Sequence, residues 1–151
     1  MRRLKAFTLL EVLVVLGILS AISVIIIPVA VSQLRRDQAE STATDITSAM
    51  FAQQQKAVTG QASSGYGIAI YSNKYTIYKG ASLAAATVKD DVTFTSGLSI
   101  SNINLAAGGN EIKFNQGSVT PNTTGSFNIN SSNSTYKVDI NREGLISTTR
   151  Q

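Results

Sequence analysis

An uncharged run of 23 residues near the N-terminus constrains this chain more than any other feature. It extends from Val12 to Leu34 and reads VLVVLGILSAISVIIIPVAVSQL. As an α-helix with a rise of about 1.5 Å per residue, this run is roughly 35 Å long, which is enough to cross the ~30 Å hydrocarbon core of a bilayer. The sequence therefore predicts a membrane-spanning helix.

Basic residues flank this run on both sides. Three of them lie within residues 2–5, and Arg35 and Arg36 follow the run. Basic residues next to a spanning helix favour the cytoplasmic side. Asp37 and Glu40 offset the second group, so we expect a single-pass chain with a cytoplasmic N-terminus and the C-terminal domain outside.

Two general explanations of this N-terminus compete with a more specific one. A secretory signal peptide would be cut near Ala30-Val31-Ser32, but its apolar core would be about 7–15 residues long, shorter than the run seen here. A simple signal anchor has the required length. Neither explanation accounts for the carboxylate of Glu11, which directly precedes the uncharged run.

Glu11 is costly in a spanning helix unless it finds a partner or reaches the membrane edge. Insertion scales assign about 2.5–3.5 kcal/mol to a carboxylate at the centre of such a helix. Glu11 could simply mark the end of the helix, where the cost is smaller. It also stands four residues after Phe7, so cleavage between Ala6 and Phe7 would create an ammonium group that Glu11 could pair with, on its own chain or on a neighbour.

The segment from Lys5 to Glu11, KAFTLLE, resembles the class III leader of type IV prepilins and type II secretion pseudopilins. The resemblance implies that prepilin peptidase removes residues 1–6 by cutting after Ala6 and N-methylates Phe7. It also implies that Glu11 registers the subunit during assembly. The family usually has Gly where this chain has Ala6, which leaves the efficiency of cleavage open. Pro28 matches a proline of the family and is expected to kink the helix.

The resemblance also implies partners and a location. The partners are prepilin peptidase, other pilin or pseudopilin subunits in a homo- or hetero-filament, and the cytoplasmic membrane before assembly. After assembly the subunit would lie in an extracellular or periplasmic filament. In this reading, residues 7–34 are the transmembrane and assembly helix.

Residues 35–59 are predicted to continue the same helix. They contain neither Gly nor Pro, and Gly60 is a stop signal. The alternative is a break into two helices near Gln33. A thin apolar stripe with spacings of three to seven residues predicts the face that packs on the domain: Ala39, Ala43, Ile46, Met50 and Ala57.

From residue 65 the apolar pattern alternates, which predicts short strands. Ser72-Asn73 separates two such runs and indicates a hairpin. The region 81–89 is expected to be a loop or a helical turn. Further strands are predicted at 92–94, 98–105, 111–114, 126–129, 136–140 and 145–147, with a turn at 141–144. The predicted fold is α+β: a long helix packed on a small antiparallel sheet, a single meander formed by residues 60–151.

Composition argues against an enzyme. The chain has neither Cys nor His, so thiol and imidazole chemistry are excluded. Removing Arg2, Arg3 and Lys5 from the 13 basic residues leaves ten against nine acidic ones, and nucleic acid is therefore an unexpected partner. No cofactor or metal is expected. Asp90-Asp91 could bind calcium with Asp139 or Glu143, but a solvated loop is favoured.

The predicted function is a structural subunit of a type IV pilus-like or type II secretion-like filament. A looser resemblance over residues 65–148, from the Tyr-Gly-Ile hairpin to the Asn-x-x-Gly turn, is to H-type minor pseudopilins and FimT-like pilins. The short domain without Cys favours a minor subunit. The alternative is a tip-located binding pilin for adhesion or DNA uptake, for which Arg142 and Arg150 are the candidate contacts.

Overall fold

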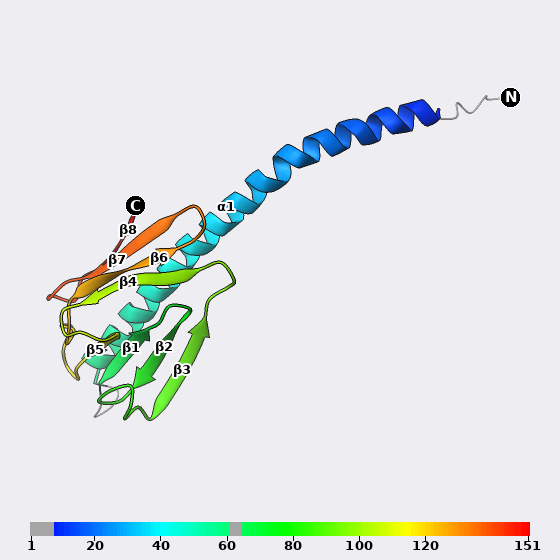
Figure 1. The fold of residues 1–151 in the computed structure, drawn as a ribbon. Coiled ribbons are helices and arrows are strands. Elements are labelled where there is room, and N and C mark those ends of the chain that lie inside the picture. The colour runs from blue at the N-terminus through cyan, green and yellow to red at the C-terminus, as the bar shows by residue number, and fades with distance from the viewer. Residues whose placement is uncertain (1–7, 61–64) are drawn as a thin grey trace. The chain divides into compact units, whose positions relative to one another are not determined.

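The structure, a computed structural model, describes residues 8–60 and 65–151 (Figure 1). The predicted cleavage site at Ala6 and Phe7 lies outside the described residues. The chain divides into two units, residues 1–34 and residues 35–151. The second unit contains the C-terminal part of the long helix and all the strands that the structure describes.

The helix α1 extends without a break from Leu9 to Val58. The alternative of two helices separated near Gln33 is therefore wrong, in keeping with the absence of a breaking residue there. Gly60 follows the helix with a φ of 63°, the left-handed conformation that commonly closes a helix and that glycine adopts without strain. The predicted stop signal is thus confirmed.

The strands that the structure describes form two four-stranded antiparallel sheets. Sheet A has the order β3-β2-β1-β5, and sheet B has the order β4-β6-β7-β8. The strands of sheet A are β1 (Tyr66–Ile70), β2 (Lys74–Lys79), β3 (Val88–Thr93) and β5 (Glu111–Phe114). Those of sheet B are β4 (Ser99–Leu105), β6 (Gly125–Asn130), β7 (Thr135–Ile140) and β8 (Ile146–Arg150).

The α+β class with a long helix on antiparallel strands is confirmed, but the strands do not form one meander. The chain leaves sheet A after β3, forms β4 in sheet B, and returns for β5. The return is made in a turn in which Gly108 and Gly109 have φ values of 71° and 73°. Beyond it, Asn110 and Ile70 exchange hydrogen bonds that start β5 beside β1.

The hairpin predicted around Ser72-Asn73 is confirmed. Ile68 lies opposite Ile77, and Ile70 lies opposite Tyr75, so all four side chains face the same side of sheet A. The strand β3 begins at Val88 rather than at residue 92, because Val88 pairs with Lys79. Its polar sequence did not resemble a strand because β3 is the edge of the sheet and is almost entirely exposed.

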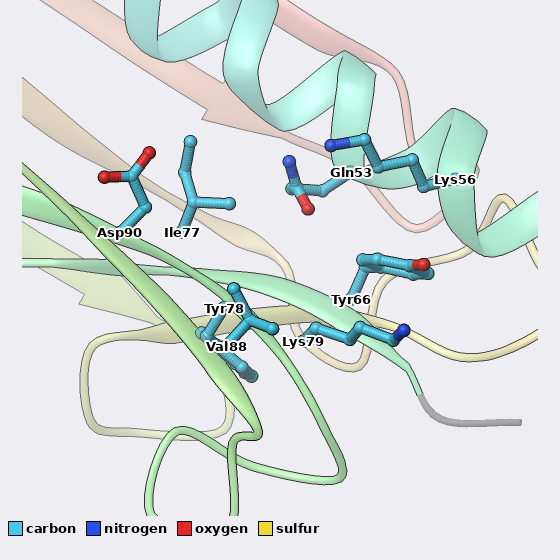
Figure 2. Close-up of a pocket in the computed structure, with 8 residues that line it drawn as sticks. All are labelled: Gln53, Lys56, Tyr66, Ile77, Tyr78, Lys79, Val88 and Asp90. Carbon is cyan, nitrogen blue, oxygen red and sulfur yellow. The ribbon is translucent and has the colours of Figure 1, made fainter. Parts of the chain in front are cut away.

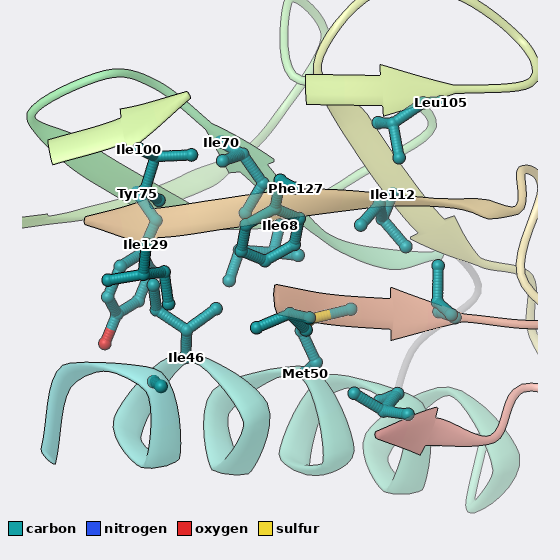
Figure 3. Close-up of a cluster of buried hydrophobic side chains, with 14 of the residues drawn as sticks. Ile46, Met50, Ile68, Ile70, Tyr75, Ile100, Leu105, Ile112, Phe127 and Ile129 are labelled. Carbon is teal, nitrogen blue, oxygen red and sulfur yellow. The ribbon is translucent and has the colours of Figure 1, made fainter. Parts of the chain in front are cut away.

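The helix stripe predicted from the sequence is buried, as Figure 3 shows for Ile46 and Met50. These side chains meet Ile68 and Ile112 from sheet A and Phe127 from sheet B. Ala39, Ala43 and Ala57 are also buried, and their small size lets the strands approach the helix closely. The C-terminal part of α1 and the inner faces of both sheets therefore share one hydrophobic core.

Polar contacts also fasten this part of α1 to sheet B and its loops. The hydroxyl of Tyr136 donates a hydrogen bond to the Glu40 carboxylate at 3.0 Å. The amide of Gln54 donates to two loop carbonyls, that of Val119 at 2.7 Å and that of Gly144 at 2.9 Å. Both polar contacts and apolar packing thus set the position of the helix in this unit.

Candidate assembly site on the N-terminal helix

The first half of α1 exposes a continuous apolar surface. An 18-residue window reaches a mean hydropathy of 3.0, and none of that window is buried within the chain. The large apolar side chains described between residues 9 and 34 expose between 45% and 82% of their surface. By length and composition, this helix can cross a membrane.

Glu11 is the acidic residue in the first turn of α1. Thr8 precedes the helix, and its hydroxyl accepts a hydrogen bond from the backbone N–H of Glu11 at 3.2 Å. Thr8 is therefore the N-cap, and Glu11 is the third helical residue. A carboxylate in this turn also interacts favourably with the positive end of the helix dipole.

Thr8 is a functional candidate that the sequence reasoning missed. The signal was present, because Thr8-Leu9-Leu10-Glu11 has the Thr-x-x-Glu spacing of a capping box. Glu11 is thus suited both to helix capping and to pairing with a cation beyond the helix start. The pairing predicted between Glu11 and the amine of Phe7 involves a residue outside the described part of the chain.

Pro28 lies inside α1, and the helix continues past it. Proline has no N–H, so the carbonyl of Val24 receives no helical hydrogen bond from position 28. The hydroxyls of Ser20 and Ser23 donate to the carbonyls of Leu16 and Leu19, each at 2.8 Å, which satisfies these hydroxyls without water. The expected kink at Pro28 remains a prediction.

The acidic residues considered for calcium do not converge. Asp90 and Asp91 lie on the strand β3 rather than in the expected loop, and Asp139 lies on β7 of the other sheet, paired with Lys137. Hydrogen bonds from Lys74 and then from Thr76 lower the pKa of the Asp91 carboxyl. Across residues 8–60 and 65–151, no three acidic side chains are grouped as a metal site.

The two arginines considered for DNA lie at different hollows of the second unit. Arg150 lines one hollow together with Arg36 and Glu40 from the helix. Arg142 lines another, beside Ala106 and Pro121. Arg142 and Arg150 therefore do not line the same hollow.

Comparison with known proteins supports the assignment of the N-terminus. Residues 1–27 match the family model described as the prokaryotic N-terminal methylation motif. This match confirms the resemblance to the class III leader that was seen from Lys5 to Glu11. No curated protein matches the chain by sequence.

The fold also has a counterpart among solved structures. It is similar to the minor pseudopilin EpsH from the type 2 secretion system of Vibrio cholerae, with a TM-score of 0.56 and 11% sequence identity. The similarity covers 75% of this chain and 97% of the EpsH chain. The chain therefore has a pseudopilin-like fold.

Proposed function

We propose that this chain is a structural subunit of a type IV pilus-like or type II secretion-like filament, held in the membrane and then polymerised through its N-terminal helix. One observation carries the proposal: an unburied apolar helix segment, residues 9–34, that has the carboxylate of Glu11 in its first turn and leads into a folded α+β domain. The proposed role is mechanical and includes no catalytic step.

The exposed apolar helix needs an apolar environment in each state of the protein. Burial of apolar surface is favourable by about 25 cal/mol per Å², so more than a dozen large exposed side chains would not stay in water. Before assembly, lipid would cover them. After assembly, the corresponding helices of neighbouring subunits would cover them, which is how one segment can serve both as anchor and as polymerisation surface.

In this proposal, Glu11 sets how the helix is aligned with the helices of neighbouring subunits when it moves from the lipid into the filament. A carboxylate at an apolar helix–helix contact is stable only when it faces a partner. We propose that this partner is the amine of Phe7, formed when prepilin peptidase removes residues 1–6. The match of residues 1–27 to the N-terminal methylation motif supports this processing and the methylation of Phe7. The N-terminus would face the cytoplasm and the domain of residues 60–151 would lie outside.

Mass spectrometry of the mature chain tests the processing step. The expected product lacks residues 1–6 and carries a methyl group on the nitrogen of Phe7. A substitution Ala6→Gly should speed cleavage, and Ala6→Leu should block it, because the peptidase accepts a small residue before the cut in the resembled family. A mature N-terminus at Gln33 would instead show a secretory signal peptide and refute the proposal.

Two substitutions separate the proposed assembly role of the Glu11 charge from the helix-capping role that its Thr-x-x-Glu spacing suits. Glu11→Gln removes the charge but keeps a side chain that suits the third position of a capping box. Glu11→Val removes both properties. If the charge is required, both variants should insert in the membrane and be processed, yet neither should enter filaments. Incorporation of the Gln variant at the wild-type level would show that only capping matters.

A further inference from the structure

A groove opens between the C-terminal part of α1 and the side of sheet A that ends at β3 (Figure 2). It holds about 360 Å³ of open space. The helix contributes Gln53 and Lys56 to its lining. The floor is formed by Tyr66 of β1 and by Ile77 and Lys79 of β2.

Strand register explains why these side chains share one face. Ile77 pairs with Ile68 of the core, so both point to the side of sheet A that α1 covers. On the other side of β2, Ile77 pairs with Asp90, and Lys79 pairs with Val88. Val88 and Asp90 therefore extend the same face outward onto β3, where Val88 exposes 58% of its surface.

Gln53 is the unusual residue of this groove. As a whole residue it is only 2% exposed, and its side chain makes no hydrogen bond with any other residue that the structure describes. No fully buried polar side-chain atom among the described residues lacks a partner, so the amide of Gln53 must reach the open space of the groove. The adjacent Gln54, also buried, donates to two backbone carbonyls. An amide that faces a groove and has no protein partner can bond to water or to a bound group. The Gln53 amide, which lines the groove, is therefore poised to bond a group that enters it.

The charges around Gln53 point to a carboxylate. Lys56 follows one turn along the helix, and Lys79 lies below Tyr66, with its Nζ 6.0 Å from the centroid of the tyrosine ring. Neither lysine forms a salt bridge within the described residues. Two ammonium groups and an amide N–H make a donor-rich end, which suits an anion that accepts several hydrogen bonds.

The other end of the groove has a different character. Ile77 and Val88 offer apolar surface, and Asp90 lies on β3 directly opposite Ile77. Asp90 would repel an anion placed beside it, so the carboxylate belongs at the lysine end. Along the strands, the pair Lys79 and Val88 at the donor end is therefore followed by the pair Ile77 and Asp90.

The free edge of sheet A favours a peptide over a small molecule. The strand β3 is at one end of the order β3-β2-β1-β5, so its outer backbone groups have no neighbouring strand in the sheet. An extended segment laid along that edge would pair with β3 and would turn alternate side chains toward the groove. One of these could be aliphatic and the next could be acidic.

We propose that this groove binds an acidic peptide segment of a partner protein, whose carboxylate lies between Gln53, Lys56 and Lys79 and whose aliphatic side chain packs on Ile77 and Val88. The groove lies wholly in the domain of residues 35–151 and does not depend on the processing of the N-terminus. Failure of this proposal would therefore leave the proposed filament role untouched, and the reverse also holds.

The test uses the full chain, labelled with ¹⁵N and held in detergent micelles. The probe is the peptide acetyl-Thr-Leu-Thr-Glu-Thr-amide, in which leucine and glutamate point to the same side of an extended strand. The side-chain amide signal of Gln53, identified by its loss in Gln53→Leu, should shift and saturate as peptide is added. A matched peptide with glutamine in place of glutamate should bind roughly tenfold more weakly.

Three variants make the test specific to the groove. Lys79→Gln should weaken binding, and Asp90→Asn should strengthen it by removing repulsion. Lys89→Gln is the control, because Lys89 lies next to Val88 on the same strand but pairs with Tyr78 and points to the opposite face. Equal binding of the two peptides, or equal effects of Lys79→Gln and Lys89→Gln, would overturn the proposal. So would a Gln53 shift that follows protein concentration without peptide, which would identify a second copy as the occupant.

Discussion

Gly67 and Tyr78 lie directly opposite each other across the β1–β2 hairpin, and the tyrosine ring fills the space that a side chain at position 67 would need. A Cβ atom at Gly67 would stand 2.4 Å from Cζ and 2.5 Å from Oη of the tyrosine. The ring is fully buried, and its hydroxyl donates a hydrogen bond to Glu111 at 3.1 Å. It therefore has little freedom to move aside.

Gly67→Ala should lower the free energy of unfolding by about 1–3 kcal/mol, the usual cost of overpacking a filled interior. Urea unfolding of the purified chain measures this change. In a Tyr78→Leu background the added methyl group meets no ring, so the same substitution should cost much less there. An equal cost in both backgrounds would contradict the steric explanation.

Tyr78 should also make the domain sensitive to alkali. Burial first, and then the nearby Glu111 carboxylate, raise the pKa of this phenol well above its usual 10.0. A group with a raised pKa contributes stability that is present below its unfolded-state pKa and is lost at higher pH. The unfolding free energy should therefore fall with pH above about 10, and Tyr78→Phe should make this fall shallower. Tyr71→Phe, at a partly exposed tyrosine, controls for the loss of one phenol.

The lowered pKa of Asp91 should make the unfolding free energy depend on pH under acidic conditions. Hydrogen bonds from Lys74 and then Thr76 lower its pKa below the usual 3.8. A lowered pKa contributes stability that is present above that usual value and is lost as pH falls through the folded-state value. In the Asp91→Asn variant, the unfolding free energy should therefore decrease less steeply as the pH is lowered. Asp90→Asn removes a carboxylate from the same strand without breaking the contacts to Lys74 and Thr76, and a flattening as large in that variant would refute the assignment.

The features that follow from local sequence were predicted correctly. The length of α1, its buried stripe from Ala39 to Ala57 and its stop at Gly60 all follow from helix periodicity and from glycine chemistry. The hairpin around Ser72-Asn73 follows from strand alternation. The class III leader was recognised from a short motif whose residues are contiguous, so no knowledge of the fold was needed.

The features that depend on pairing between distant segments were not predicted. The local sequences of β4 and β5 do not show that β4 belongs to sheet B and β5 to sheet A, because each is simply a short alternating run. The strand β3 was started too late because its side chains are those of an exposed edge. Gln53 and Gln54 are adjacent in a polar stretch, and only the fold shows that both are buried and that one of them is hydrogen-bonded.

The two glutamines should also differ in how much each contributes to the stability of the domain. Gln54→Leu would leave the carbonyls of Val119 and Gly144 without their hydrogen-bond donor, and the loss should lower the unfolding free energy by about 1–3 kcal/mol. Gln53→Leu removes an amide that faces the groove and has no protein partner, so its effect on stability should be near zero or favourable. Both variants place the same leucine on the same turn of α1 and can be compared by urea unfolding at neutral pH. A Gln53→Leu variant as unstable as Gln54→Leu would show that the Gln53 amide already supports the fold and is not held ready for a ligand.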